Sequence, residues 1–145
     1  MNAEEFTRRY QAGERDFRRA DLSEADLALA TLAQANLAQA DLHNANLVQA
    51  NLAGADLSWV ILSWADLSGA HLEGANLTMA NLTGSDLTGA DLTGVNLHMV
   101  DLRWAILAGA NLRQANLLMA DVTKEQLASA GSLQGATLPD GTMHK

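Results

Sequence analysis

The chain has 145 residues, 48% of them hydrophobic, which is enough for one domain with one continuous core. Acidic residues outnumber basic ones by 17 to 9, for a formal net charge of −8. This acidity disfavours nucleic-acid binding, which needs a basic surface to neutralise phosphates, and the lack of cysteine excludes disulfides and thiol chemistry.

The N-terminal residues predict a short helix over residues 3–12. Asn2 followed three positions later by Glu5 has the pattern of a helix N-cap, and Phe6 and Tyr10 lie four apart on one helical face. We expect this apolar face to cover the adjacent end of the repeats described next. No apolar signal region or membrane-spanning run is present, so we expect a cytoplasmic protein.

One five-residue pattern runs from Asp16 to Val122 without insertion or deletion. Its central residue is Phe17, then Leu at every fifth position from Leu22 to Leu117, and finally Val122. The residue two before the centre is small, mostly Ala, and the residue just before the centre is mostly Asp or Asn. Four repeats depart from Asp or Asn at that position: Thr31, Ile61, His71 and Ile106.

A period of five fits neither a helix nor a straight strand. In a helix the leucines would spread over every face, and in a strand alternate leucines would point to opposite faces. The chain must therefore turn once per repeat, with the Leu and the small residue pointing inward. Repeats this small cannot bury their apolar side alone, so the pattern predicts a stacked solenoid.

The five-residue register ends at Val122. Thr123 and Gln126 have the pattern of a capping box and predict a second short helix over residues 124–130, ended by Gly131. The apolar surface that closes the last coil is expected from Leu127, Leu133 and Leu138.

The repeats ADLSE (residues 20–24), ANLTM (75–79) and ADLTG (90–94) resemble the pentapeptide repeat family, and segments 8–17 and 133–141 resemble the ends of cyanobacterial members. The resemblance implies an all-β fold. This fold is a right-handed quadrilateral β-helix with four repeats to a coil, about five coils in all, and short terminal capping helices.

On this basis we expect one domain over residues 1–145. It divides into an N-terminal helical cap (1–14), a repeat solenoid (15–122) and a C-terminal cap (123–145).

With four repeats to a coil, residues twenty apart lie above one another, and two corners then collect bulky apolar residues. Every inward position is already occupied by Leu or a small residue, so these side chains point outward. Contiguous exposed apolar surface usually marks a partner site. The candidate partner-binding patch consists of Trp59, Ile61, Trp64, Met79, Met99, Trp104, Ile106 and Met119. The alternative, that bulky corner residues only shield backbone between coils, stays open.

No constellation in the sequence points to catalysis. His43, His71 and His98 fall on three different sides, so they form no metal or nucleophile–base site. His71 and Glu73 should project side by side, but as a solvated surface. A core filled with leucine leaves no cleft, so we expect no enzyme activity, cofactor or metal.

We therefore expect a non-enzymatic interaction, scaffold or regulatory module with an unidentified protein partner. It should bind neither nucleic acid nor membrane, and be a monomer or weak side-by-side dimer. The alternative comes from the family resemblance, since some bacterial members mimic DNA and protect gyrase from quinolones. It would use one acidic column, formed by Asp21, Asp41, Asp101 and Asp121.

Overall fold

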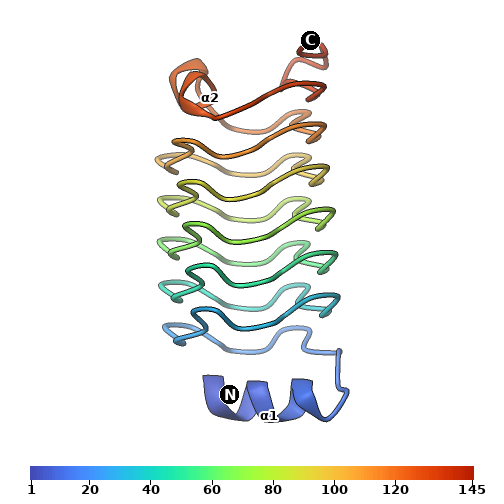
Figure 1. The fold of residues 1–145 in the computed structure, drawn as a ribbon, viewed down its shortest axis with the longest axis vertical. Coiled ribbons are helices and arrows are strands. Elements are labelled where there is room, and N and C mark those ends of the chain that lie inside the picture. The colour runs from blue at the N-terminus through green and yellow to red at the C-terminus, as the bar shows by residue number, and fades with distance from the viewer.

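Each repeat pairs with the repeat that follows twenty residues later, as in the parallel bridges Asp16 to Asn36 and Asn36 to Asp56. Four repeats therefore complete one coil, and the coils stack into a short rod with a helix at each end (Figure 1). The computed structural model describes residues 1–145. Its helices, α1 (Ala3–Gln11) and α2 (Lys124–Ser129), confirm the two predicted helices.

The four sides of the rod are named here by their bridged residues. Side 1 contains Asp16, Asn36, Asp56, Asn76, Asn96, Asn116 and Thr137. Side 2 contains Asp21, Asp41, Ile61, Asn81, Asp101 and Asp121. Side 3 contains Asp26, Asn46, Asp66, Asp86 and Ile106. Side 4 contains Thr31, Asn51, His71, Asp91, Asn111 and Ser132.

The core of the rod is formed by the central residues of the repeats and the small residues two positions before them. The leucines from Leu22 to Leu117 are buried, and most of the alanines are buried beside them. Ser85, in an alanine position, is the one buried polar residue. The predicted inward and outward positions are confirmed.

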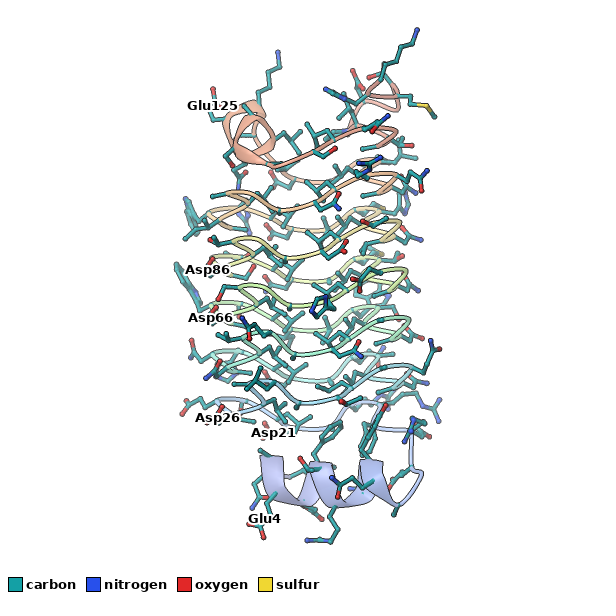
Figure 2. The ribbon with its side chains drawn as sticks, viewed as in Figure 1. Glu4, Asp21, Asp26, Asp66, Asp86 and Glu125 are labelled. Atoms are coloured by element: carbon teal, nitrogen blue, oxygen red, sulfur yellow. The ribbon has the colours of Figure 1, made fainter.

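Asp and Asn recur before the central residue because their side chains hold the following turn. The Oδ1 atom of Asp56 accepts a hydrogen bond from the Ser58 backbone N–H at 3.0 Å, and Asn36 does the same for Ala38 at 3.2 Å. The bond needs only an oxygen acceptor, so Asn serves as well as Asp. Side 3 therefore carries charge that the turns do not require, and its residues Asp26, Asp66 and Asp86 are labelled in Figure 2.

The turn has the same conformation at every corner. Its second central residue, two positions after the Leu, has a positive φ, as for Trp59 at 59°, Gln39 at 62° and Gly74 at 69°. The next N–H then donates back across the turn, for example from Val60 to the Leu57 carbonyl at 3.1 Å. These are type II turns, and non-glycine residues adopt them at a cost of about 1 kcal/mol each.

α1 closes the lower end of the core, as predicted. The Asn2 side chain caps the helix by accepting from the Glu5 N–H at 2.8 Å. Phe6 is buried against Phe17, with 4.5 Å between the ring centroids. The Tyr10 hydroxyl donates to the Ala33 carbonyl at 2.7 Å, which ties the helix to the first coil.

α2 begins with the predicted capping box of Thr123 and Gln126. The Gln126 amide also donates to the carbonyls of Leu102 (2.6 Å) and Ala105 (2.9 Å), which fastens α2 to the coil below. Neither α1 nor α2 is long and apolar enough to span a membrane.

Beyond α2 the ladder resumes, although the five-residue register ends at Val122. Ser132 and Thr137 pair with Asn111 and Asn116, now twenty-one residues apart instead of twenty. The predicted role of Gly131 as the helix stop is wrong, because α2 ends at Ser129 with Ala130 as an extended C-cap. Gly131 instead permits close approach, since a Cβ atom there would lie 2.9 Å from the Gly109 carbonyl oxygen.

Candidate protein-interaction surface

The eight residues of the predicted patch lie on one part of the rod, and we call them the Trp–Met surface. Side 2 runs through the middle of this surface and has an apolar corner along each edge. The corner between sides 1 and 2 carries Trp59, Met79, Met99 and Met119. The corner between sides 2 and 3 carries Trp64 and Trp104, while Ile61 lies on side 2 and Ile106 on side 3.

Seven of the eight residues are exposed. The exposed fractions of the three tryptophans are 55% for Trp59, 60% for Trp64 and 72% for Trp104. The isoleucines and the two upper methionines are exposed as well. Met79 is half-buried in the ladder between Trp59 and Met99, so it contributes less to the accessible surface.

The Trp64 ring packs against a glycine, Gly84, in the next coil. A Cβ atom on Gly84 would lie 2.4 Å from Cε3 of the Trp64 ring, so the indole lies against the Gly84 backbone. The opposite face of the ring points outward. The twenty-residue period places Gly84 directly above Trp64, and this signal in the sequence could have identified Gly84 as part of the site.

A hollow of about 300 Å³ lies beside Trp104, between the corner and α2. Its other lining residues are Arg103, Ala105, Asp121, Thr123 and Gln126. It gives the otherwise convex corner a recess in which a partner side chain could lie.

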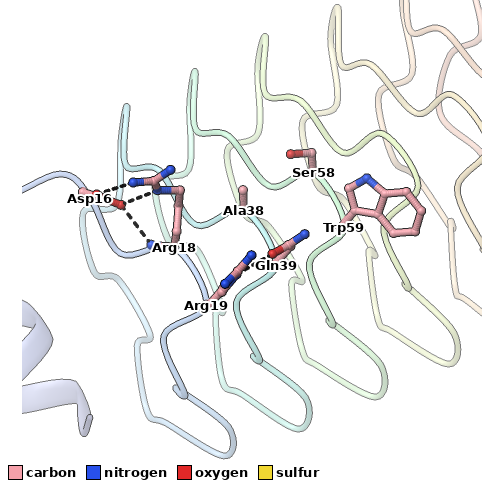
Figure 3. A pocket seen from close by; sticks show the side chains of 7 residues that line it. All are labelled: Asp16, Arg18, Arg19, Ala38, Gln39, Ser58 and Trp59. Atoms are coloured by element: carbon pink, nitrogen blue, oxygen red, sulfur yellow. Dashed lines mark hydrogen bonds and ion pairs between the residues drawn. The ribbon is translucent and has the colours of Figure 1, made fainter.

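A second hollow, of about 600 Å³, lies near the base of side 1 (Figure 3). Arg18 is paired there with Asp16 at 2.9 Å, and Arg19 donates to the Gln39 side chain at 2.7 Å. Trp59 borders this hollow as well as side 2. The ring is therefore accessible from two sides of the rod.

The acidic column of side 2 is partly neutralised. Arg103 pairs with Asp101 at 2.8 Å and lies 3.8 Å from Asp121, and the hydrogen bond from Arg103 lowers the pKa of Asp101. His43 Nδ1 lies 2.8 Å from Asp41, and the hydrogen bond with this carboxylate raises the pKa of His43. The column is thus less negative than its acids alone indicate.

The histidines are arranged as the period predicts. His71 lies between Asn51 and Asp91 on side 4, with its Nδ1 3.3 Å from Glu73 Oε1. His43 and His98 project from sides 2 and 1. No three His, Cys, Asp or Glu side chains converge as ligands for a metal ion.

The family profile described as pentapeptide repeats matches the sequence in eight copies, over residues 25–63, 61–98 and 96–124. The chain belongs to the pentapeptide repeat family. A comparison with curated proteins finds no match.

Solved structures of pentapeptide repeat proteins are similar to this one. Rfr23 from the cyanobacterium Cyanothece 51142 is 46% identical with a TM-score of 0.60, over 61% of this chain and 60% of that chain. The chain therefore spans less than two thirds of that relative. A protein from the Arabidopsis thaliana thylakoid lumen is 28% identical with a TM-score of 0.64, over 81% of this chain and 76% of that chain.

QnrB1, a plasmid-mediated fluoroquinolone resistance protein, is 20% identical with a TM-score of 0.56, over 86% of this chain and 79% of that chain. At this identity the likeness concerns the fold alone. Together the comparisons confirm the all-β, right-handed quadrilateral β-helix predicted from the sequence.

Proposed function

We propose that this pentapeptide repeat protein is a non-enzymatic protein-interaction module whose Trp–Met surface contacts the partner. The observation that carries the proposal is that the turns do not require these bulky residues. Gln39 and Gln114 adopt φ values of 62° and 59° at the same turn position, against 59° for Trp59 and 62° for Trp104. Large rings left exposed where a polar residue suffices are typical of binding anchors.

Packing accounts for part of the surface only. Trp64 covers the Gly84 backbone and Met79 is half-buried, so part of both side chains is used in packing within the rod. Trp104 is 72% exposed and Ile106 49% exposed, so the chain leaves most of Trp104 and about half of Ile106 uncovered. A partner that covers them would gain about 25 cal/mol for each Å² of apolar area buried.

The test replaces Trp59, Trp64 and Trp104 together with Gln. The matched control is Leu29→Gln, because Leu29 is 72% exposed at the same turn position on another corner. Thermal unfolding followed by circular dichroism should change little in either variant. Capture of a binding partner from cyanobacterial extract, and any self-association measured by sedimentation velocity, should be lost in the triple variant alone.

Two results would contradict the proposal. If the triple variant unfolds, the tryptophans serve the fold. If it folds and every association persists, the binding surface lies elsewhere.

Two predictions from the sequence stay untested. One is a single domain with an N-terminal cap (1–14), a solenoid (15–122) and a C-terminal cap (123–145), and the other is a cytoplasmic location. The location is tested by fractionating cells that express the tagged protein, since the relative from the thylakoid lumen occupies a different compartment.

The DNA-mimic alternative receives less support. The pair of Arg103 with Asp101 reduces the negative charge of the column it would use. The likeness to QnrB1 adds nothing beyond the fold.

A further inference from the structure

We propose that the partner segment bound by the Trp–Met surface is cationic as well as apolar. Its Lys or Arg side chains would bind over the Trp64 ring and against the carboxylates of Asp66 and Asp86. This inference rests on the proposed function and specifies the chemistry of the partner.

The first argument is the charge around the surface. No bridged residue of sides 2 and 3 is Lys or Arg. The basic residues beside them are Arg103, which is already paired with Asp101, Arg19 in the lowest turn between sides 1 and 2, and Lys124 at the start of α2. The acids on these two sides are Asp21, Asp26, Asp41, Asp66, Asp86, Asp101 and Asp121. Complementary charge therefore favours a basic partner.

The second argument concerns two particular acids. Asp66 and Asp86 are bridged neighbours in successive coils of side 3, and they lie one above the other in Figure 2. The Oδ1 atom of Asp66 accepts from the Ser68 hydroxyl at 2.7 Å, and that of Asp86 from the Thr88 hydroxyl at 2.6 Å. Neither carboxylate has a cationic partner within the chain, and neither Oδ2 atom accepts a hydrogen bond.

The fold does not require these two charges. Asn46, directly below Asp66 in the same column, holds the same turn by accepting from the Val48 N–H at 3.1 Å. Two carboxylates in adjacent strands repel each other, so the pair weakens the free protein slightly. A bound cation removes that repulsion, and asparagine in the same positions would not provide this binding energy.

The third argument is the aromatic ring beside the two acids. Trp64 precedes Asp66 by two residues and is pressed onto Gly84, which precedes Asp86 by two. One ring face is thus occupied by the chain while the other is open at a corner next to both carboxylates. A Lys or Arg that binds there would gain a cation–π interaction together with charge pairing.

A second copy of the chain fits this surface poorly. A two-fold dimer through this surface would bring the seven acids of sides 2 and 3 close to those of the second copy, and each copy has a formal net charge of −8. We therefore infer a different protein with a Lys- or Arg-containing apolar segment as the occupant.

The test uses a short amphipathic peptide of leucine and lysine as the probe, and a matched peptide with glutamate in place of lysine. All three tryptophans of the chain lie on the Trp–Met surface, so intrinsic fluorescence reports binding of the probe directly. The key variant is Asp66→Asn with Asp86→Asn. The control is Asp91→Asn with Asp140→Asn, which changes the charge equally on side 4 and in the C-terminal turn.

We expect the lysine peptide to bind the native chain, with affinity reduced about tenfold by the Asp66 and Asp86 substitutions and less than about twofold by the control. The glutamate peptide should not bind. The Asp66 and Asp86 variant should melt no lower than the native chain. Should it fail to fold, the corresponding pair of serine substitutions takes its place, because Ser132 holds the same kind of turn through its hydroxyl.

Failure of this inference and failure of the proposed function give different results. Equal binding of the lysine peptide by the native chain and the Asp66 and Asp86 variant, or tight binding of the glutamate peptide, would overturn the cation site. Calorimetry with the variant carrying Gln at Trp59, Trp64 and Trp104 tests the surface itself. If this variant binds the lysine peptide as tightly as the native chain does, the proposed function is overturned.

Discussion

At the level of single residues, Ser85 shows how the core treats a polar group. Its hydroxyl donates to the Leu82 carbonyl at 2.8 Å, and that carbonyl also accepts from the Ser85 backbone N–H at 3.1 Å. The carbonyl therefore keeps a partner if the hydroxyl is removed. Alanine fills the equivalent position in most other repeats, so the space is suited to it.

We expect Ser85→Ala to leave the free energy of unfolding unchanged within about 1 kcal/mol or to raise it. The reason is that it removes a buried hydroxyl without leaving an unpaired group. Urea unfolding at equilibrium measures the change. A loss above about 2 kcal/mol would show that the hydroxyl has a structural role beyond its bond to Leu82.

His43 provides a residue-level pH dependence. The hydrogen bond with Asp41 raises the pKa of His43 in the folded protein above the ordinary value of about 6.5. A raised folded-state pKa gives stability that is complete below the ordinary value and is lost as pH rises through the raised value. The free energy of unfolding of the native chain should therefore fall as pH rises from about 6.5 through the raised pKa of His43. His43→Gln should remove the contribution of this residue to the fall.

NMR titration of the His43 ring checks the direction of the shift, and urea unfolding across the same interval checks the stability. With Asp41→Asn, which keeps the acceptor for the turn, the His43 pKa should return toward the ordinary value. A native His43 that titrates at or below about 6.5 would contradict the prediction.

At the level of the turn, the fold combines one backbone conformation with very different side chains. Glycine suits the positive φ of 69° at both Gly74 and Gly84, but the two differ in their surroundings. An added Cβ meets nothing within 4 Å at Gly74, whereas at Gly84 it meets the Trp64 ring at 2.4 Å. The two glycines therefore separate backbone strain from displacement of the ring.

Gly74→Ala and Gly84→Ala should each cost about 1 kcal/mol for the left-handed conformation. Gly84→Ala should cost more, because the Trp64 ring must leave the backbone on which it lies. Its tryptophan emission should also change, while Gly74→Ala should leave the emission as in the native chain. Identical emission spectra for the two variants would show that Trp64 does not rest on Gly84 in solution.

At the level of the whole molecule, α1 covers the lower end of the rod while side 2 and its two apolar corners stay open to solvent. The net charge of −8 is unevenly distributed, since Arg103 neutralises part of side 2. The surface with the most exposed apolar area is thus the one where the acidic column is interrupted by Ile61 and Asn81. Side 2 is therefore not a continuous strip of negative charge, which a DNA mimic would present.

We therefore expect the purified protein, at micromolar concentration, neither to inhibit supercoiling by DNA gyrase nor to relieve its inhibition by a quinolone. Supercoiling of relaxed plasmid measures both effects. Clear inhibition that disappears when Asp21, Asp41, Asp101 and Asp121 are changed to Asn would establish the DNA-mimic alternative instead.

The sequence by itself determined a stacked solenoid, its inward and outward positions and both capping helices. Each of these follows from local chemistry: a period of five with small residues inside, Asp or Asn to hold each turn, and cap residues at Asn2 and Thr123. The number of four repeats to a coil came from the family resemblance. The composition of the Trp–Met surface followed from the period together with the four-repeat coil of the family, in which residues twenty apart share a column.

Only the tertiary structure decided how neighbouring coils use these positions. The return of the ladder at Ser132 depends on how many residues α2 needs to leave and rejoin the rod, which no repeat period specifies. Side chains in adjacent coils also decide three features that the period does not specify. These are the half-burial of Met79, the packing of the Trp64 ring on Gly84 and the lack of a cationic side chain beside Asp66 and Asp86. A periodic sequence specifies which residues are neighbours, whereas the direction each side chain takes is settled by packing and charge between coils.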